Sequence, residues 1–180
     1  QDPGLRSTLT RIQEESEYRK AARIRLVPQG TALTSLGGTP SAIRISGGRG
    51  LSWGPDRRLV LFDAKDLRDL GLIGTTESAG YELALSRDGR RAATIESRAL
   101  TIWNVEKGQA LARRNGTRYQ GLEFSPDGKR LIVGEASSVV VLSSEGVFER
   151  SLPLGNGVDA AGIATSAADV FVLTSRYGLW

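Results

Sequence analysis

The sequence contains one hairpin motif twice, 39 residues apart, and this repeat restricts the fold more than any other feature. In residues 122–134 (LEFSPDGKRLIVG), two apolar runs flank a four-residue turn. Proline presets φ for a type I turn, aspartate bonds its own backbone, and glycine adopts a left-handed conformation without steric cost. Residues 83–95 (LALSRDGRRAATI) repeat this arrangement. The sequence therefore predicts equivalent β-hairpins with these turn residues: Ser86, Asp88 and Gly89 in one, and Ser125, Pro126, Asp127 and Gly128 in the other.

Weaker matches continue the period on both sides of the two hairpins. Ser46 ends an apolar run (IRIS), as Ser86 and Ser125 do, and residues 142–143 follow residues 103–104 by 39 positions. A further unit begins at Ala161. Periods of about 40 residues, each with several short strands, are typical of β-propeller blades, small sheets that bury their faces against neighbouring blades.

Three apolar runs support stacked sheets. Residues 131–133 (LIV), 139–142 (VVVL) and 170–173 (VFVL) are apolar at consecutive positions, so we expect them to be covered on both faces. The predicted fold class is all-β, a partial β-propeller of four-stranded blades of about 40 residues, preceded by one N-terminal α-helix. Residues 1–22 are interpreted as a helical linker or the tail of a preceding domain. Residues 23–180 are interpreted as a propeller segment with about three full blades and partial blades at both ends.

These residues resemble the WD40 repeat family. The segment 124–131 (FSPDGKRL) is similar to the hairpin of that family, and 100–104 (LTIWN) followed by Gly108 is similar to its closing strand. The resemblance extends to divergent bacterial WD40-like and TolB-like propellers. It assigns a closing-strand role to Phe62, Asp63, Trp103 and Asn104. Because the chain has no histidine, the Gly-His dipeptide and the buried His-Ser/Thr-Trp-Asp network of the family cannot exist here.

The amino-acid composition excludes most catalytic mechanisms. The 180 residues include no Cys and no His, which excludes disulfides, thiolate nucleophiles and the commonest general base. Paired carboxylates remain available, but Asp88 and Asp127 occupy equivalent turn positions, which accounts for both. No D-x-D-x-D-G spacing occurs, and Gly47-Gly48-Arg49-Gly50 is not followed by the residues of a phosphate-binding loop. We predict no catalytic residues, no metal and no cofactor, and therefore no enzyme.

The expected partner is a protein or an acidic peptide. In propellers of the WD40 family, the loops between the second and third strands and the loops that join successive blades lie on one rim, where partners dock. The resemblance places four basic residues on or near this rim: Arg90, Arg91, Lys129 and Arg130. Arginine suits carboxylate ligands. Nucleic acid is not expected, because the net charge is only +4 and the basic pairs are scattered. Membrane insertion is not expected either, because no apolar run is long enough.

The predicted function is a non-catalytic scaffold or sensor in signalling, within a larger, bacterial, multidomain protein. Two alternatives remain: a propeller-fold hydrolase that uses carboxylates, and a periplasmic TolB-like envelope protein. The expected location is cytoplasmic, or periplasmic if a signal peptide has been removed. We expect open sheet edges to be covered by missing blades, by the N-terminal helix or by a partner.

Overall fold

The computed structural model describes residues 41–78, 80–116, 118–155, 158–166, 169–174 and 178–179. Every regular element in these ranges is a β-strand. Nothing in them is a helix long and apolar enough to cross a membrane. The helix predicted at residues 2–22, and the predicted boundary between residues 22 and 23, lie outside the described residues.

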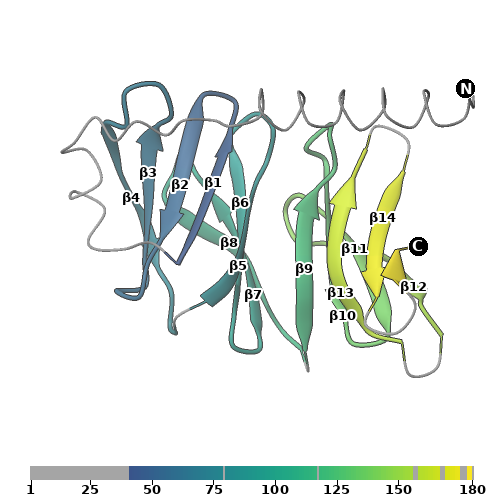
Figure 1. Ribbon diagram of the computed structural model, residues 1–180. Coiled ribbons are helices and arrows are strands. Elements are labelled where there is room, and N and C mark those ends of the chain that lie inside the picture. The colour runs from purple at the N-terminus through teal and green to yellow at the C-terminus, as the bar shows by residue number, and fades with distance from the viewer. Residues whose placement is uncertain are drawn as a thin grey trace, which may run out of the picture. The chain divides into compact units, whose positions relative to one another are not determined.

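The strands form four antiparallel sheets in chain order, here called blades 1 to 4 (Figure 1). Blade 1 contains β1 (Ala42–Ser46), β2 (Arg49–Trp53), β3 (Arg58–Asp63) and β4 (Asp69–Thr75). Blade 2 contains β5 (Gly80–Leu85), β6 (Arg91–Glu96), β7 (Ala99–Asn104) and β8 (Gln109–Asn115). Blade 3 contains β9 (Tyr119–Phe124), β10 (Arg130–Glu135), β11 (Ser138–Ser143) and β12 (Phe148–Pro153). Blade 4 contains β13 (Ala160–Thr165), β14 (Val170–Thr174) and β15 (Gly178–Leu179).

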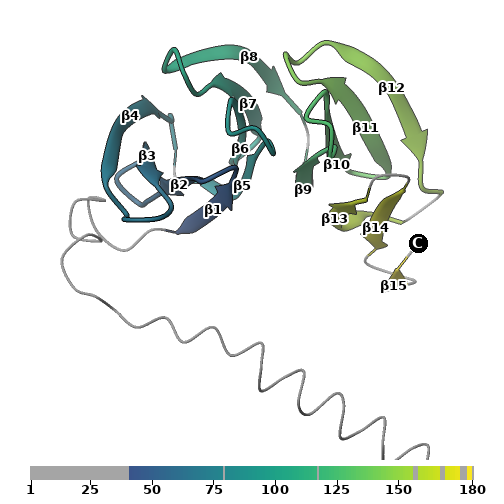
Figure 2. The same ribbon diagram turned by 90° about the horizontal axis from the view of Figure 1, so that it is seen from above.

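The blades stack on one another through their first strands. β1 contacts β5, β5 contacts β9, and β9 contacts β13. Seen from above, the first strands lie on the inside of an arc, and β4, β8 and β12 lie on its outside (Figure 2). Each blade is a meander, so strand order within a sheet follows the sequence. The prediction of an all-β propeller with four-stranded blades is confirmed.

Apolar clusters fill the spaces between successive blades. Leu51, Trp53 and Leu59 of blade 1 pack against Leu83 and Trp103 of blade 2. A second cluster joins blades 2 and 3, and a smaller one joins blades 3 and 4. The large indole rings require glycine opposite them: a Cβ on Gly80 would overlap the Trp53 ring. Burial of this apolar area is the main source of stability for such sheets, since no blade can shield both faces alone.

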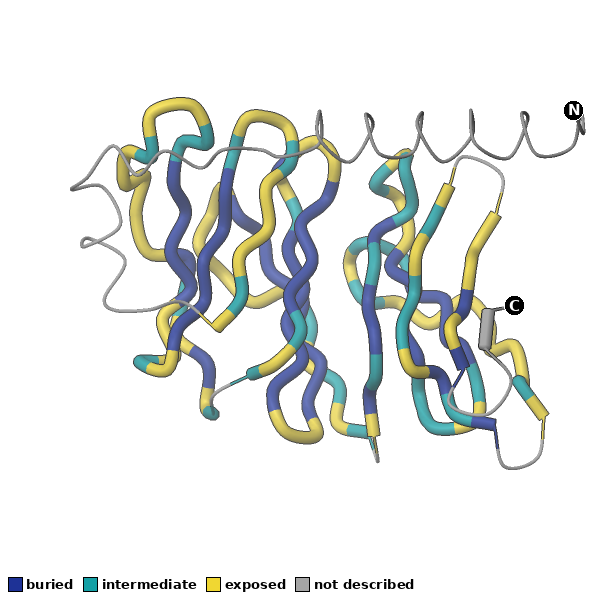
Figure 3. The backbone as a smooth tube through the Cα atoms, viewed as in Figure 1, coloured by how far each residue is buried: buried dark blue, intermediate teal, exposed yellow. Residues whose placement is uncertain are grey.

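The predicted two-sided burial is correct for two of the three apolar runs. Residues 131–133 and 139–142 are all buried. For residues 170–173 the prediction is wrong, because Val170, Phe171 and Leu173 are 43%, 40% and 47% exposed. Val170 and Val172 share the face of β14 toward blade 3, where Val172 is buried and Val170 lies at an open groove. No described residue covers the other face, which carries Phe171 and Leu173. Figure 3 shows this difference between the dark blue strands of blades 2 and 3 and the yellow segments of β14.

Candidate functional site

The two predicted hairpin turns have the same hydrogen bonds. The Ser86 hydroxyl donates to Asp88 Oδ1, and the Ser125 hydroxyl donates to Asp127 Oδ1, both at 2.6 Å. The same carboxylate oxygens accept from the backbone N–H of Arg90 at 3.0 Å and of Lys129 at 3.1 Å. At the glycine positions, φ is +69° in residue 89 and +70° in residue 128, a conformation that glycine adopts readily.

These bonds hold both turn carboxylates in the ionised state. The hydrogen bond from Ser86 lowers the pKa of Asp88 below its usual value, and the bond from Ser125 does the same for the pKa of Asp127. A carboxylate that accepts several hydrogen bonds favours its charged form. Both aspartates are therefore occupied as turn acceptors, and neither is positioned as a general acid.

The hairpin turns lie on the opposite rim from the one that the sequence predicted. They join the first and second strands of blades 2 and 3. In an antiparallel meander, such turns share a rim with those between third and fourth strands. Salt bridges agree: Arg90 pairs with Glu106 and Arg91 with Glu145, each at 3.3 Å, and both glutamates lie in third-to-fourth turns. The predicted placement of Arg90, Arg91, Lys129 and Arg130 on the second-to-third rim is therefore wrong.

The residues to which the resemblance assigns a closing-strand role end the third strands of their blades. Phe62 and Asp63 end β3, while Trp103 and Asn104 end β7, and each of these is the third strand of its blade. β4 and β8 pair outside them. The error in the rim placement has a physical cause. The outermost strands face solvent along much of their length and carry little apolar signal, so the sequence does not show which two strands of a blade each turn joins.

Three of the four basic residues predicted to bind a partner already have partners within the chain. Besides the two salt bridges above, Arg130 Nε lies 2.6 Å from Glu149 Oε2. Only Lys129 has no ion pair through its side chain in the described ranges. Binding of a partner by these four residues stays a prediction.

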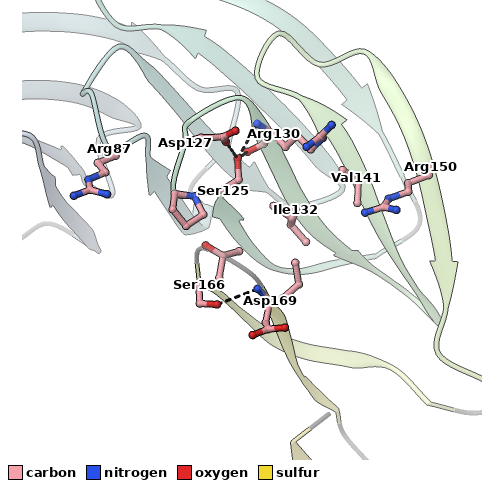
Figure 4. Close-up of a pocket in the computed structure, with 12 residues that line it drawn as sticks. Arg87, Ser125, Asp127, Arg130, Ile132, Val141, Arg150, Ser166 and Asp169 are labelled. Atoms are coloured by element: carbon pink, nitrogen blue, oxygen red, sulfur yellow. Dashed lines mark hydrogen bonds between the residues drawn. The ribbon is translucent and has the colours of Figure 1, made fainter.

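A groove of about 470 Å³ lies between blades 3 and 4, beside the Ser125 turn. We call it the blade 3–4 groove. Ile132 of β10, Val141 of β11 and Val170 of β14 give it apolar walls, and Arg87 and Arg150 also line it. Figure 4 shows Arg87 and Arg150 on opposite sides, with Ile132 and Val141 between them. Val141 pairs with Ile132 on one side and with Arg150 on the other, so the three residues form one row across the sheet.

Some charged side chains of the blade 3–4 groove have partners within the chain, and others do not. Asp127 is held by the turn, and Arg130 by Glu149. The side chains of Arg87 and Arg150 make no hydrogen bond or ion pair with any described residue, and both residues are exposed. An arginine that lacks an internal partner beside apolar side chains suits a ligand with a carboxylate and an aliphatic part. The sequence did not single out these arginines, because Arg150 lies on a polar outer strand with no motif.

The opposite rim carries a buried ionic network. Glu96 is 1% exposed, and its carboxylate accepts from the backbone N–H of Glu77 at 2.7 Å and of Ser78 at 3.0 Å. It also accepts from Thr101 Oγ1 and pairs with Arg113 Nη1 at 2.9 Å. These bonds attach the loop between blades 1 and 2 to the second-to-third hairpin of blade 2. A buried charge with this many donors is structural.

Two buried tryptophans donate hydrogen bonds to threonine hydroxyls. Trp103 Nε1 donates to Thr94 Oγ1 at 3.0 Å in the interior of blade 2. Trp53 Nε1, at the end of β2, donates to Thr76 Oγ1 in the loop between blades 1 and 2 at 3.1 Å. Buried indole N–H groups thus have the acceptors they require.

Two acidic side chains of the innermost strands, Glu82 of β5 and Glu123 of β9, lie near each other. Burial raises the pKa of Glu82 and of Glu123, and the nearby Arg44 guanidinium opposes this rise in each pKa. Across the described ranges, no group of three or more acidic, histidine or cysteine side chains is arranged to hold a metal ion.

Comparison with known proteins identifies the fold. Neither a family model nor a curated protein matches the sequence. The chain is similar to the structure of U3-55K, with a TM-score of 0.63 and 21% identity over 75% of this chain and 45% of that one. It is also similar to the crystal structure of RRP9 WD40 repeats, with a TM-score of 0.66 and 22% identity over 79% and 48%. The chain thus spans about half the length of these structures. Its described residues have the fold of a WD40-like propeller.

Proposed function

We propose that this chain is a non-catalytic protein-interaction module, a segment of a WD40-like propeller that acts as a scaffold or sensor. The observation that carries the proposal is the blade 3–4 groove, where Arg87 and Arg150 lack internal partners beside an apolar wall. Concave sites with apolar walls and a few convergent polar groups are typical ligand sites. The fold supports the proposal by analogy alone, since a fold by itself does not define a function.

The proposed partner is an acidic peptide or an acidic protein surface. Arg87, Arg150 and Lys129 are available cations on this side of the molecule, whereas Arg90, Arg91 and Arg130 are already paired. An exposed ion pair contributes little by itself. Two effects would supply most of the specificity: the positive charge of the groove attracts an acidic partner, and the partner's aliphatic groups contact the apolar wall. The four residues predicted from the sequence remain a second docking surface to be tested beside this one.

Charge reversal tests the proposal. The probe is a fluorescein-labelled polyglutamate peptide of about ten residues, with binding measured by fluorescence anisotropy at two ionic strengths. We expect the intact chain to bind, and the double variant Arg87→Glu with Arg150→Glu to bind about tenfold more weakly or worse. The matched control is Arg58→Glu with Arg98→Glu, two exposed residues outside the groove with the same charge change. It should retain most of the affinity.

Two outcomes would contradict the proposal. If the intact chain does not bind the peptide, its partner is not an acidic segment. Equal loss in the groove variant and the control would mean that only net charge matters. A third variant, in which Arg90, Arg91 and Lys129 are replaced by Glu while Arg130, which also lines the groove, is kept, compares the docking surface predicted from the sequence with the groove.

A further inference from the structure

A second groove, of about 500 Å³, lies between blades 1 and 2. We call it the blade 1–2 groove. Both blades that form it are complete four-stranded sheets. Buried Leu61, Ile73 and Val105 line it, together with Leu70 and Leu72 of β4, which are 41% and 50% exposed. Its volume is typical of small-molecule sites, which span roughly 300–1,000 Å³.

Gly71 keeps this space open. It pairs with Leu61, and at the same level of blade 2 Ala112 pairs with Ile102. A Cβ on Gly71 would meet no atom within 4 Å, whereas a Cβ on Gly146 of blade 3 would lie 2.5 Å from that of Ala112. At Gly71 φ is +121°, a conformation that favours glycine. The interface between blades 2 and 3 is therefore filled at the level where the blade 1–2 groove is open.

The ion pair that joins blades 2 and 3 has no counterpart between blades 1 and 2. Arg49 and Arg91 are the first residues of β2 and β6, the second strands of blades 1 and 2. Arg91 reaches forward to Glu145 in the third-to-fourth turn of blade 3, at 3.3 Å. Glu106, in the equivalent turn of blade 2, lines the groove but pairs with Arg90 of its own blade. Arg49 is therefore left without the anion that its position has in the next interface.

Two cations thus line the blade 1–2 groove without an anionic partner among the described residues. Nη1 of Arg49 donates to the Gly89 carbonyl oxygen at a long 3.4 Å, and the Lys107 side chain makes no hydrogen bond or ion pair in those ranges. Asp63, the cross-strand neighbour of Arg49, accepts from the backbone N–H of Lys65 instead. Positive charge beside exposed leucines suits an anion that has an aliphatic part.

We propose that the blade 1–2 groove binds a small aliphatic carboxylate. The carboxylate accepts hydrogen bonds from Arg49 and Lys107, and the hydrocarbon chain lies against Leu70 and Leu72. Arginine presents two parallel N–H donors to a carboxylate, which fixes the orientation of the ligand. This site takes a small molecule, and it does not rest on the acidic protein partner proposed for the blade 3–4 groove.

The test titrates the intact, ¹⁵N-labelled chain with hexanoate at constant ionic strength. The amide signals of Gly71 and Gly108 report on the blade 1–2 groove, and that of Thr165 reports on the blade 3–4 groove. We expect saturable shifts at the two glycines, with a Kd of about 1 mM for a ligand of this size. Hexanamide, which lacks the charge, and acetate, which lacks the chain, should each bind at least about fivefold more weakly.

Variants assign the binding to the two cations. Arg49→Gln with Lys107→Gln should weaken hexanoate at least about fivefold. The matched control, Arg58→Gln with Arg98→Gln, makes the same charge change at exposed residues outside the groove and should bind like the intact chain. Lys107→Gln alone changes an exposed turn residue and should weaken binding about twofold. It gives the answer if the double variant does not fold.

Four results would overturn the inference. They are the absence of a saturable shift at Gly71 and Gly108, equal binding of hexanamide or acetate, equal loss of affinity in the control variant, and shifts at Thr165 in place of the two glycines. The polyglutamate assay concerns the other groove, so failure of hexanoate binding would leave the proposed function standing.

Discussion

Two apolar strands of similar sequence have different surroundings in this molecule. Residues 139–142 (VVVL) on β11 are buried on both faces, whereas residues 170–173 (VFVL) on β14 expose three of their four side chains. The sequences differ by one aromatic residue, so composition does not explain the difference. The explanation is the neighbouring blade: β11 has one on each side, while β14 has one side without a described neighbour. In stacked sheets, the burial of an apolar run is set by the next repeat.

The strongest test of this comparison introduces an aspartate into each strand and compares the loss of stability. Val140→Asp puts a carboxylate into the cluster between blades 2 and 3, where it has no partner. It should lower the free energy of unfolding by about 3–5 kcal/mol. Leu173→Asp places the same group on an exposed face and should cost less than about 1 kcal/mol.

Urea unfolding followed by circular dichroism measures both variants against the intact chain. Leu173→Ser, which adds no charge, is the matched control at the exposed position. Equal destabilisation by the two aspartates would mean that the outer face of blade 4 is covered, and the comparison would fail.

The same contrast between covered and open positions should hold for ion pairs. Glu96 is buried and pairs with Arg113, whereas Glu145, which pairs with Arg91, has a side chain that is 66% exposed. Glu96→Gln keeps the shape but leaves the Arg113 charge without its partner and weakens several charge-assisted bonds, so it should cost about 2 kcal/mol. Glu145→Gln should cost less than about 0.5 kcal/mol. Urea midpoints measured at low and high salt should show this order, and a larger loss in Glu145→Gln would contradict it.

Features of the fold that adjacent residues determine can be predicted from this sequence, whereas features that depend on contacts between distant residues cannot. The turns at Ser86 and Ser125 depend on four adjacent residues, so their hydrogen bonds follow from local chemistry and the repeat can be recognised. From that repeat, the propeller class and the four-stranded blades are predicted correctly. The rim on which the hairpin turns lie is not predicted correctly, because an outer strand such as β12 (FERSLP) is exposed throughout and carries no apolar period that would mark its place in the blade.

The site residues escape prediction for the same reason. Glu96 becomes a buried acceptor only because Glu77 and Arg113, far away in the sequence, fold against it. Arg150 lines a groove only because blade 4 approaches blade 3. Contacts between blades decide both roles, and a single sequence records no signal for them. The four basic residues beside the turns were noticeable instead because they repeat with the hairpin.

Acidic groups in the turns and on the inner strands should respond to pH in opposite directions. The folded state raises the pKa of Glu82, chiefly through burial. Its contribution to stability is therefore complete below the unfolded pKa and is lost as pH rises through the folded pKa. Asp127 has a lowered pKa because of Ser125. Its contribution is present above the unfolded pKa and is lost as pH falls through the folded pKa.

Two isosteric variants separate these effects. Glu82→Gln should be more stable than the intact chain at neutral pH, with the difference disappearing in acid. Asp127→Asn should be less stable at neutral pH, and this difference should also disappear in acid. Thermal midpoints measured across the acid range give both curves. Destabilisation by Glu82→Gln at neutral pH would contradict the effect assigned to burial.

The smallest expected effect concerns loops, whose conformation is local and should not depend on neighbouring blades. Ser97 and Ala136 lie in the second-to-third loops of blades 2 and 3, with φ of +51° and +46°. Residues other than glycine are strained in this region, so Ser97→Gly and Ala136→Gly should each stabilise the chain by about 0.5 kcal/mol. Ser138→Gly, within β11, is the control and should be destabilising. Because the strain is local, the two loop variants should give equal shifts in urea midpoint. A gain in only one blade would mean that contacts between blades set loop conformation as well as strand burial.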